Sequence, residues 1–388
     1  MNAKYIYKIF VITSLVIAST FFAGCMDSSS TSQSVSNSNN DIITVTDALG
    51  RTVEVPKSPE HVICSGSGAL RYLTYLEAHD RIVAVDSIET EGSKFDARPY
   101  AIANPQFKEY PVFGEFRGND DPEKILALDP QPQVIFKMYS TSGYDPAELQ
   151  KKTGIPVIAL NYGDMVNNRA DMYNSLRIMG EVMGKEDRSE ELIAFFDSTI
   201  ADLKERTADV PEEEKTTCYV GGIALSGPHG FQSTEPTYPP FLFTNAKNVA
   251  YDPMNLTTAE VSKESILGWD PEVIFVDLST TQSEDKSSAL YQLQNDVSYK
   301  KLTAVQKGEV YGVLPYNLYA QNQGSVLADA YFAGKLLYPD RFEDVNLENK
   351  TIDIYTFLIG RGDEEIGRHV YENMISSFPV PAFTKLDV

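Results

Sequence analysis

The sequence predicts an α/β fold of two Rossmann-like lobes, each built on a parallel β-sheet and joined to the other by one long helix. Three observations predict it: strand-like apolar runs alternate with helical patterns, a helix–strand segment occurs twice, and a long helical pattern separates the two copies. Strands that alternate with helices form parallel sheets through right-handed crossovers. We therefore expect a ligand cleft between the lobes, because ligands of open α/β sheets bind beyond the carboxyl ends of the strands.

The repeated segment covers 123–136 in the first half of the chain and 264–275 in the second. Each copy begins with a glutamate, continues through an Ile-Leu pair to Asp-Pro, and ends on the apolar run Val-Ile-Phe. Proline ends the helix because it removes an amide donor and restricts the residue before it. The apolar run is typical of a parallel strand that is covered on both faces. The repeat indicates two related lobes.

Further apolar runs fit the same scheme. They predict strands at 61–64, 82–85, 133–136 and 156–160 in the first lobe, and at 217–220, 273–276 and 309–314 in the second. Helical patterns cover 68–78 and 325–337. Alternation of polar and apolar residues from 43 to 55 predicts a β-hairpin with Gly50 at its turn.

The helical pattern between the two halves extends from Lys185 to about Ala208. Its apolar residues recur at helical spacing, and they are Leu192, Ile193, Phe196, Ile200 and Leu203. Acidic residues near its start suit the unpaired amides of a helix N-terminus. A helix of about 22 residues spans roughly 33 Å. This length favours a helix that crosses from one lobe to the other, and the alternative is a core helix inside one lobe.

The first 25 residues indicate export. Two lysines precede an apolar stretch at 9–22, and small residues then lead to Cys25, which is the layout of a signal peptide over 1–24. The Ala-Gly-Cys ending is similar to a lipobox, although Phe22 stands where leucine is usual. We expect lipidation of Cys25 and an anchor on the outer face of the cytoplasmic membrane. The alternative is an ordinary cleaved signal peptide.

The remaining chain divides by composition and pattern. The polar stretch that follows the anchor cannot bury enough apolar surface to fold, so it predicts a flexible tether. The expected organisation is a tether at 25–40, a first lobe at 41–167, an interlobe helix region at 168–210 and a second lobe at 211–388. A net charge of −22 argues against nucleic acid as a partner. Cys64 and Cys218 fall in different lobes, which favours two buried thiols over a disulfide.

Several segments in order resemble a known family. They are the lipoprotein start, Thr44-Val-Thr-Asp-Ala-Leu-Gly-Arg-Thr-Val-Glu-Val-Pro56, Pro59-Glu-His-Val-Ile63, the two Glu-x-Ile-Leu-x-x-Asp-Pro segments, and 299–310 with Leu302-Thr-Ala-Val. Together, over roughly 43–341, they resemble the iron-chelate and vitamin B12 binding proteins of ABC importers, whose lobes are joined by one long helix. The resemblance implies a monomeric receptor, not an enzyme, that has no cofactor of its own. Its ligand would be an iron(III) siderophore, haem or a corrinoid.

The resemblance also implies a contact with the membrane permease. In the family, an acidic residue on each lobe docks on the permease dimer that works with an ATPase, and the matching residues here are Glu123 and Glu264. Exposed carboxylates form charge-assisted hydrogen bonds to arginine and orient the partner. The alternative is that both glutamates only stabilise the start of a helix.

The candidate ligand contacts are polar and aromatic residues that follow strands. Arginine binds carboxylates through two parallel hydrogen bonds, so Arg117 suits an acidic chelate or a haem propionate, with an interlobe salt bridge as the alternative. His229 is either an axial ligand of haem iron or cobalt or a hydrogen-bonded loop histidine. The full set is Ser65, Ser67, Arg71, Phe116, Arg117, Tyr139, His229, Phe231, Tyr316, Asn317 and Tyr319.

Other functions are less well supported by the sequence. Bare zinc requires several converging imidazoles, whereas the four histidines of this chain are widely spaced. An exported chelatase-like or reductase-like enzyme and a chelate-storage lipoprotein without a transporter remain as alternatives. The chain has no complete phosphate loop and no Gly-x-Ser-x-Gly motif, which favours binding without chemistry.

Overall fold

The computed structural model describes residues 41–388, apart from 92–95, 139–142, 225–228, 256 and 282–285. The expected signal peptide, Cys25, the tether and Tyr139 therefore lie outside the described residues. The described residues belong to one compact unit. Among them, no helix has both the length and the apolar character that a membrane span requires.

The first lobe is built on a six-stranded sheet. Its strands are β3 (Val62–Ser65), β4 (Ile82–Asp86), β5 (Val112–Glu115), β6 (Asn119–Asp120), β7 (Val134–Met138) and β8 (Val157–Leu160). The order is β6-β5-β4-β3-β7-β8, and every pair is parallel except β5 with β6. The four predicted strands of this lobe are confirmed. Strands β5 and β6 were not predicted.

Short helices connect the strands of the first lobe. They are α1 (Ala69–Tyr75), α2 (Ser87–Glu91), α3 (Pro99–Ile102), α4 (Pro122–Leu126) and α5 (Pro146–Thr153), and the longer α6 (Arg169–Met183) follows the last strand. Strand β3 leads into α1 through Gly68, whose φ of +91° lies in the left-handed region that glycine adopts without a steric cost.

The second lobe is built on a smaller sheet of four parallel strands in the order β11-β9-β13-β14. These strands are β9 (Thr217–Gly221), β11 (Lys247–Asn248), β13 (Val273–Asp277) and β14 (Val310–Val313). Two short strands, β10 (Ser233–Thr234) and β12 (Ala259–Glu260), pair with each other in an antiparallel manner. The helices of this lobe are α8 (Pro239–Phe243), α9 (Lys263–Trp269), α10 (Ala289–Asn295), α11 (Thr303–Lys307) and α12 (Gln323–Leu337).

The N-terminal hairpin is confirmed. Strands β1 (Ile42–Thr46) and β2 (Thr52–Pro56) pair in an antiparallel manner, and Gly50 in the turn has a φ of +75°. Val45 and Val53 face each other in the register and are buried, which matches the alternation of the sequence.

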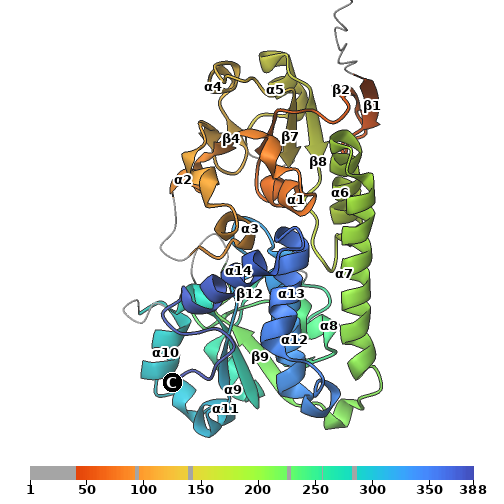
Figure 1. Cartoon of the computed structure of the whole chain (residues 1–388). Helices are drawn as coiled ribbons and strands as arrows, with labels where there is room; N and C mark the ends of the chain where they lie inside the picture. Colours follow the sequence, from red (N-terminus) through yellow and green to blue (C-terminus); the bar gives the residue numbers. More distant parts are fainter. Residues whose placement is uncertain (1–40, 92–95, 139–142, 225–228, 256, 282–285) are drawn as a thin grey trace, which may run out of the picture. The chain divides into compact units, whose positions relative to one another are not determined.

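One helix links the lobes, as the apolar spacing predicts. Helix α7 (Glu186–Thr207) has 22 residues and packs against α6 of the first lobe and against α8 and α12 of the second (Figure 1). Near its start, Nε of Arg188 donates to the carbonyl of Tyr75 at 3.1 Å. Near its end, Nη1 of Arg206 donates to the carbonyl of Arg341 at 3.0 Å. The interlobe helix is therefore confirmed, and the alternative of a core helix inside one lobe is not what the structure shows.

The C-terminal helices contact both lobes. Helix α13 (Leu347–Ile359) packs against α14 (Glu364–Ser376) and α12, and it also contacts α1 and α3 of the first lobe (Figure 1). The end of the chain thus adds a second connection between the lobes, through direct contacts between helices. The sequence did not predict this packing.

The two described cysteines are free and buried, as expected. Cys64 lies in β3 and Cys218 in β9, so they belong to different sheets. Burial raises the pKa of both thiols. A thiol in such surroundings is a weak nucleophile and a poor metal ligand.

Candidate ligand-binding site

The carboxyl ends of the first sheet carry a buried ion pair. Nζ of Lys137, at the end of β7, contacts the carboxylate of Asp120 and donates to the carbonyl of Gly118 at 3.0 Å. Ser65, at the end of β3, donates to Asp120 at 2.5 Å and accepts from Lys137 at 3.3 Å. Both charged side chains are inaccessible to solvent. Ser65 therefore serves a buried polar network here, whereas Ser67, the other serine of the predicted set, is partly accessible.

Phe116 and Arg117 follow β5 and lie beside a ring from the second lobe. The guanidinium carbon of Arg117 is 5.2 Å from the centre of the Phe116 ring, and Arg117 has a φ of +63° and is exposed. The Phe116 ring is 6.5 Å from the ring of Tyr319, which follows β14. The structure thus brings together three of the predicted contacts from two lobes. An aromatic ring beside a guanidinium suits a large, flat or acidic ligand.

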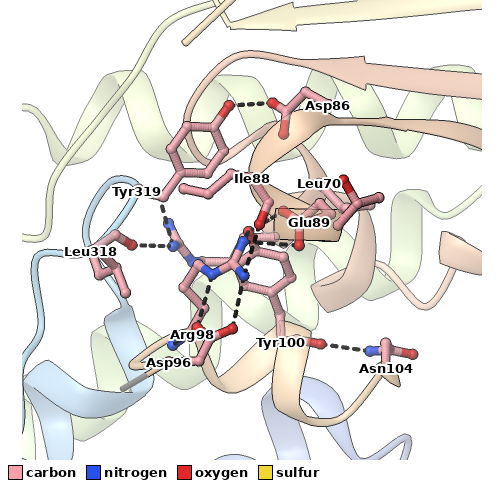
Figure 2. Close-up of polar contacts among 12 residues, drawn as sticks. Leu70, Asp86, Ile88, Glu89, Asp96, Arg98, Tyr100, Asn104, Leu318 and Tyr319 are labelled. Carbon is pink, nitrogen blue, oxygen red and sulfur yellow. Dashed lines mark hydrogen bonds and ion pairs between the residues drawn. The ribbon is translucent and has the colours of Figure 1, made fainter. Parts of the chain in front are cut away.

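Tyr319 reaches across to the first lobe. Its hydroxyl donates to the carboxylate of Asp86, at the end of β4, and accepts from the backbone amide of Arg117 at 3.1 Å (Figure 2). Burial raises the pKa of Asp86 to about 7, the hydrogen bond from Tyr319 opposes this shift, and the negative charge of Glu89 adds to it. The second oxygen of Asp86 is buried and has no hydrogen bond among the described residues.

A second buried charge network lies behind Asp86. Nη1 of Arg98 is 2.9 Å from the carboxylate of Glu89, and Arg98 also pairs with Asp96 at 2.8 Å (Figure 2). The hydroxyl of Tyr100 donates to Glu89 at 2.7 Å. Arg98 thus balances the charges of Glu89 and Asp96 near the carboxyl end of β4.

Arg71, one of the predicted ligand contacts, is buried and binds the second lobe in this structure. Its side chain is 1% exposed, and its two terminal nitrogens donate to backbone carbonyls of the loop that follows β14. Those acceptors belong to Leu318, Tyr319 and Gln321. The guanidinium therefore joins the two lobes in this structure.

The remaining predicted contacts differ in accessibility. Phe231 is fully buried, with its ring 4.9 Å from that of Tyr299 and 5.3 Å from that of Tyr219, so it belongs to the core of the second lobe here. Tyr316 is also buried and packs against Tyr238. Asn317 is partly accessible and donates to the carbonyl of Ala224 at 3.4 Å.

His229 is partly accessible and lies next to residues outside the described ones. No group of three or more His, Cys, Asp or Glu side chains suited to a metal ion occurs in the described part of the chain. In the first lobe, the buried carboxylate of Asp120 pairs with the ammonium of Lys137.

Sequence reasoning missed two residues of this region. Tyr162 follows β8, is 40% exposed, and its hydroxyl accepts from the amide of Gln321 at 2.7 Å. Glu235 follows β10, is half-buried, and its carboxylate has no hydrogen bond among the described residues. Burial, followed by the charges of Asp164 and Asp277, raises the pKa of Glu235 to about 8. The position of Tyr162 directly after a predicted strand was a usable signal, whereas no periodic pattern marks Glu235.

The two glutamates of the repeated segment occupy equivalent places. Glu123 lies in the first turn of α4, which Asp121 caps, and Glu264 lies in the first turn of α9, which Ser262 caps. Both glutamates are exposed. Each helix leads into a fully buried strand, β7 or β13, as the repeat predicts.

Known proteins are similar to this chain in sequence and in fold. The molybdate-binding protein MolA of Haemophilus influenzae is 25% identical over 80% of this chain and 89% of its own length, and the petrobactin-binding protein YclQ of Bacillus subtilis is 24% identical over 78% and 90%. The solved structure of a periplasmic solute-binding protein from Veillonella parvula matches with a TM-score of 0.65 at 21% identity, over 82% of this chain and 93% of that one. Molybdate-bound MolA matches with a TM-score of 0.63 at 22% identity, over 82% and 98%.

The family match covers both lobes. The family described as periplasmic binding protein matches residues 62–316, from β3 to the loop that follows β14. This span includes both parallel sheets and α7. Since the match extends over well more than half of the chain, this protein belongs to the periplasmic binding protein family, the solute-binding components of ABC importers.

Proposed function

We propose that this protein is the lipid-anchored receptor of an ABC importer that captures a metal chelate outside the cell and delivers it to the permease. The observation that carries the proposal is the meeting of Phe116, Arg117 and Tyr319, from two lobes, at the carboxyl ends of the two sheets. The chelate would be an iron(III) siderophore, haem or a corrinoid. Family members bind solutes and are not enzymes, so the function requires no chemistry on the ligand.

The chemistry of these side chains supports a chelate. Rings give rigid, partly apolar walls to a large ligand at little entropic cost. A guanidinium adds a bidentate donor for carboxylate, hydroxamate or catecholate oxygens. Among the relatives, YclQ is named for petrobactin and another Bacillus subtilis protein, 23% identical, for iron(3+)-hydroxamate. Ser67, His229 and Asn317 are partly accessible and complete the proposed contact set.

Delivery is assigned to Glu123 and Glu264. Their equivalent positions on the two lobes support a contact of each glutamate with one subunit of a permease dimer, because exposed carboxylates form charge-assisted hydrogen bonds to arginine. Lipidation of Cys25 and the tether at 25–40 would keep the receptor near that permease. The boundaries at 41–167, 168–210 and 211–388 remain proposals for the two lobes and the linking region.

Uptake by the host cell tests the function. Deleting the gene should reduce the uptake of one metal, supplied at limiting concentration as its chelate, and a plasmid copy of the gene should restore it. Radioactive iron, cobalt and molybdenum give three parallel readings, since molybdate is the named ligand of MolA. Unchanged uptake of iron and cobalt would contradict the chelate assignment, and a loss confined to molybdenum would replace it with an oxyanion.

A further inference from the structure

We propose that Arg71 is a positioning residue of the ligand site: it holds the loop at 316–323 of the second lobe against the first lobe and does not itself contact the ligand. The proposal rests on the proposed function in one respect, since the site that it maintains is the proposed ligand site. The contact between Arg71 and this loop, called the clamp below, does not depend on which ligand binds. The loop at 316–323 is called the interlobe loop below.

Both terminal nitrogens of Arg71 donate to the interlobe loop, whereas its Nε is buried and has no hydrogen bond among the described residues. Nη1 donates to the carbonyl of Gln321 at 2.9 Å, and Nη2 donates to the carbonyls of Tyr319 at 2.9 Å and Leu318 at 3.2 Å. The side chain is 1% exposed. Hydrogen bonds from a charged donor are stronger than neutral ones, and in a buried place they are not weakened by water. Arg71 therefore presents no terminal donor to a ligand in this arrangement.

Other charged and aromatic groups hold Arg71 itself in place. Its guanidinium carbon lies 5.1 Å from the centre of the Tyr100 ring. The charge of Arg71 acts on the buried carboxylate of Glu89, which Arg98 also pairs.

The interlobe loop has a backbone conformation that requires support from outside. Tyr319 and Ala320 have φ values of +49° and +73°. This left-handed region is disfavoured for residues with a Cβ, and two consecutive residues in it are unusual. The three carbonyls that Arg71 binds flank these two residues or belong to them. We infer that the clamp imposes this conformation on the loop.

The first lobe is shaped to receive the loop. A Cβ at Gly68 would lie 3.4 Å from Cβ of Ala320 and 3.5 Å from Nη1 of Arg71. Gly68 itself has a φ of +91°, a conformation that glycine adopts readily. The start of α1, which carries Arg71, therefore approaches the loop closely at this glycine.

Three further hydrogen bonds join the loop to the first lobe beside Arg71. The amide of Gln321 donates to the hydroxyl of Tyr162 at 2.7 Å, and the side-chain oxygen of Gln321 accepts from the amide of Met165 at 3.0 Å. The hydroxyl of Tyr75 donates to the side chain of Gln323 at 3.2 Å. Arg71 makes three of the hydrogen bonds that join this loop to the first lobe, more than any other side chain named here.

The consequence for binding follows from Tyr319. Its ring lies beside the ring of Phe116, and its hydroxyl accepts a hydrogen bond from the backbone amide of Arg117. If the loop were released, the side chains from the two lobes would no longer keep a fixed separation. Ligand binding would then have to order the site as well, at a cost in binding free energy. Arg71 thereby pre-organises the site without touching the ligand.

Hydrogen–deuterium exchange on the full chain, purified in detergent without added ligand, tests the clamp. In Arg71→Met, amides of the interlobe loop should exchange roughly tenfold faster or more, because three charge-assisted hydrogen bonds are lost. Arg71→Lys should give an intermediate rate, since an ammonium can serve some of the carbonyls. Arg81→Met is the matched control: Arg81 donates to the backbone carbonyls of Pro59 and Met183 within the first lobe, so its loss should leave the exchange of the loop unchanged.

Distances between spin labels provide the second reading. Labels at Lys124 in α4 and Lys301 in the second lobe should show a broader distance distribution in Arg71→Met than in the unsubstituted protein. Loop exchange and label distances equal to those of the unsubstituted protein would overturn the proposal. If Arg71→Met does not fold, Arg71→Lys decides it in the same way. Because no ligand is present, a failed uptake experiment leaves this result intact, and a failed clamp leaves the importer function standing.

Discussion

The hydroxyl of Tyr319, on the second lobe, donates a hydrogen bond to the carboxylate of Asp86, on the first (Figure 2). The same hydroxyl accepts a hydrogen bond from the backbone amide of Arg117, so one oxygen atom connects the end of β4, the residues after β5 and the loop after β14. Burial raises the pKa of Asp86 to about 7, well above its usual range near 4. The contact between the lobes therefore depends on a carboxyl group that titrates near neutral pH.

Removing this hydroxyl should weaken the protein. Tyr319→Phe leaves the buried carboxylate of Asp86 without this donor, and an unsatisfied buried group costs about 1–3 kcal/mol. We expect the free energy of unfolding, measured in urea, to fall by about that amount. Tyr251→Phe is the control, because Tyr251 is 53% exposed. Equal stability of the two variants would mean that the Tyr319 hydroxyl contributes nothing.

The stability of the protein should decrease as the pH rises from about 6.5 to 8.5. Burial raises the pKa of Glu235 to about 8 and that of Asp277 to about 7. Because these groups bind protons in the folded state that the unfolded chain has already lost, folding loses stability as the pH rises through these values. Burial lowers the pKa of His79 to about 4. His79 therefore changes the stability only below about pH 6.5, which is the pKa of a free imidazole.

The melting temperature across this pH range gives the measurement. Glu235→Gln, which cannot titrate, should flatten the decrease near pH 8, whereas Glu54→Gln on an exposed strand position should not. The effect of Glu235 will be smaller than for a fully enclosed carboxyl, because part of its side chain is accessible to water. A melting temperature that rises steadily from pH 6.5 to 8.5 is the opposite of what these pKa values require.

The buried pair of Lys137 and Asp120 should behave as a unit. Lys137→Met leaves Asp120 as an uncompensated buried charge, which destabilises proteins by about 3–5 kcal/mol. The double variant Lys137→Met/Asp120→Asn should recover much of this loss, because no buried charge remains. Denaturant unfolding of the two single variants and the double variant forms a cycle. Additive losses would show that the two charges do not depend on each other.

Charge reversal should separate delivery from capture. In Glu123→Arg/Glu264→Arg, we expect uptake of the chelate to fall roughly tenfold or more while ligand affinity stays unchanged, because like charges oppose arginines of the permease. Glu181→Arg/Glu343→Arg, at exposed glutamates of other elements, is the matched control. Loss of ligand affinity in the first variant would place these glutamates near the ligand instead of the permease.

Much of the fold follows from local patterns that survive in the structure. The buried strands β3, β7 and β13 are apolar on both faces, which sequence alone reveals. The spacing of Leu192, Phe196 and Leu203 predicts α7, since one stripe of the helix is buried along its length. By contrast, only the two middle residues of β5 are buried and β6 has only two residues, so neither strand forms the continuous apolar run that marks a buried strand.

The site was less predictable, because the same residue type serves different partners. Arg71 follows a strand as an anion-binding arginine would, but backbone carbonyls 247 to 250 positions away accept its hydrogen bonds, and sequence does not show where a distant loop folds back. Phe231 also follows a strand, yet its ring fills the core of the second lobe. Phe116, Arg117 and Tyr319 do come together, although β5, the strand before Phe116 and Arg117, was not predicted.

The most direct test of chelate binding is a titration of the purified protein with ferric hydroxamate, ferric petrobactin, haem, cobalamin and molybdate. Binding is measured by isothermal calorimetry and by intrinsic tyrosine fluorescence. The account predicts saturable binding of one chelate at one site per chain, weakened in Phe116→Ala and Arg117→Ala. A folded protein that binds none of the chelates, or that binds molybdate alone, would contradict the assignment of this protein as a metal-chelate receptor.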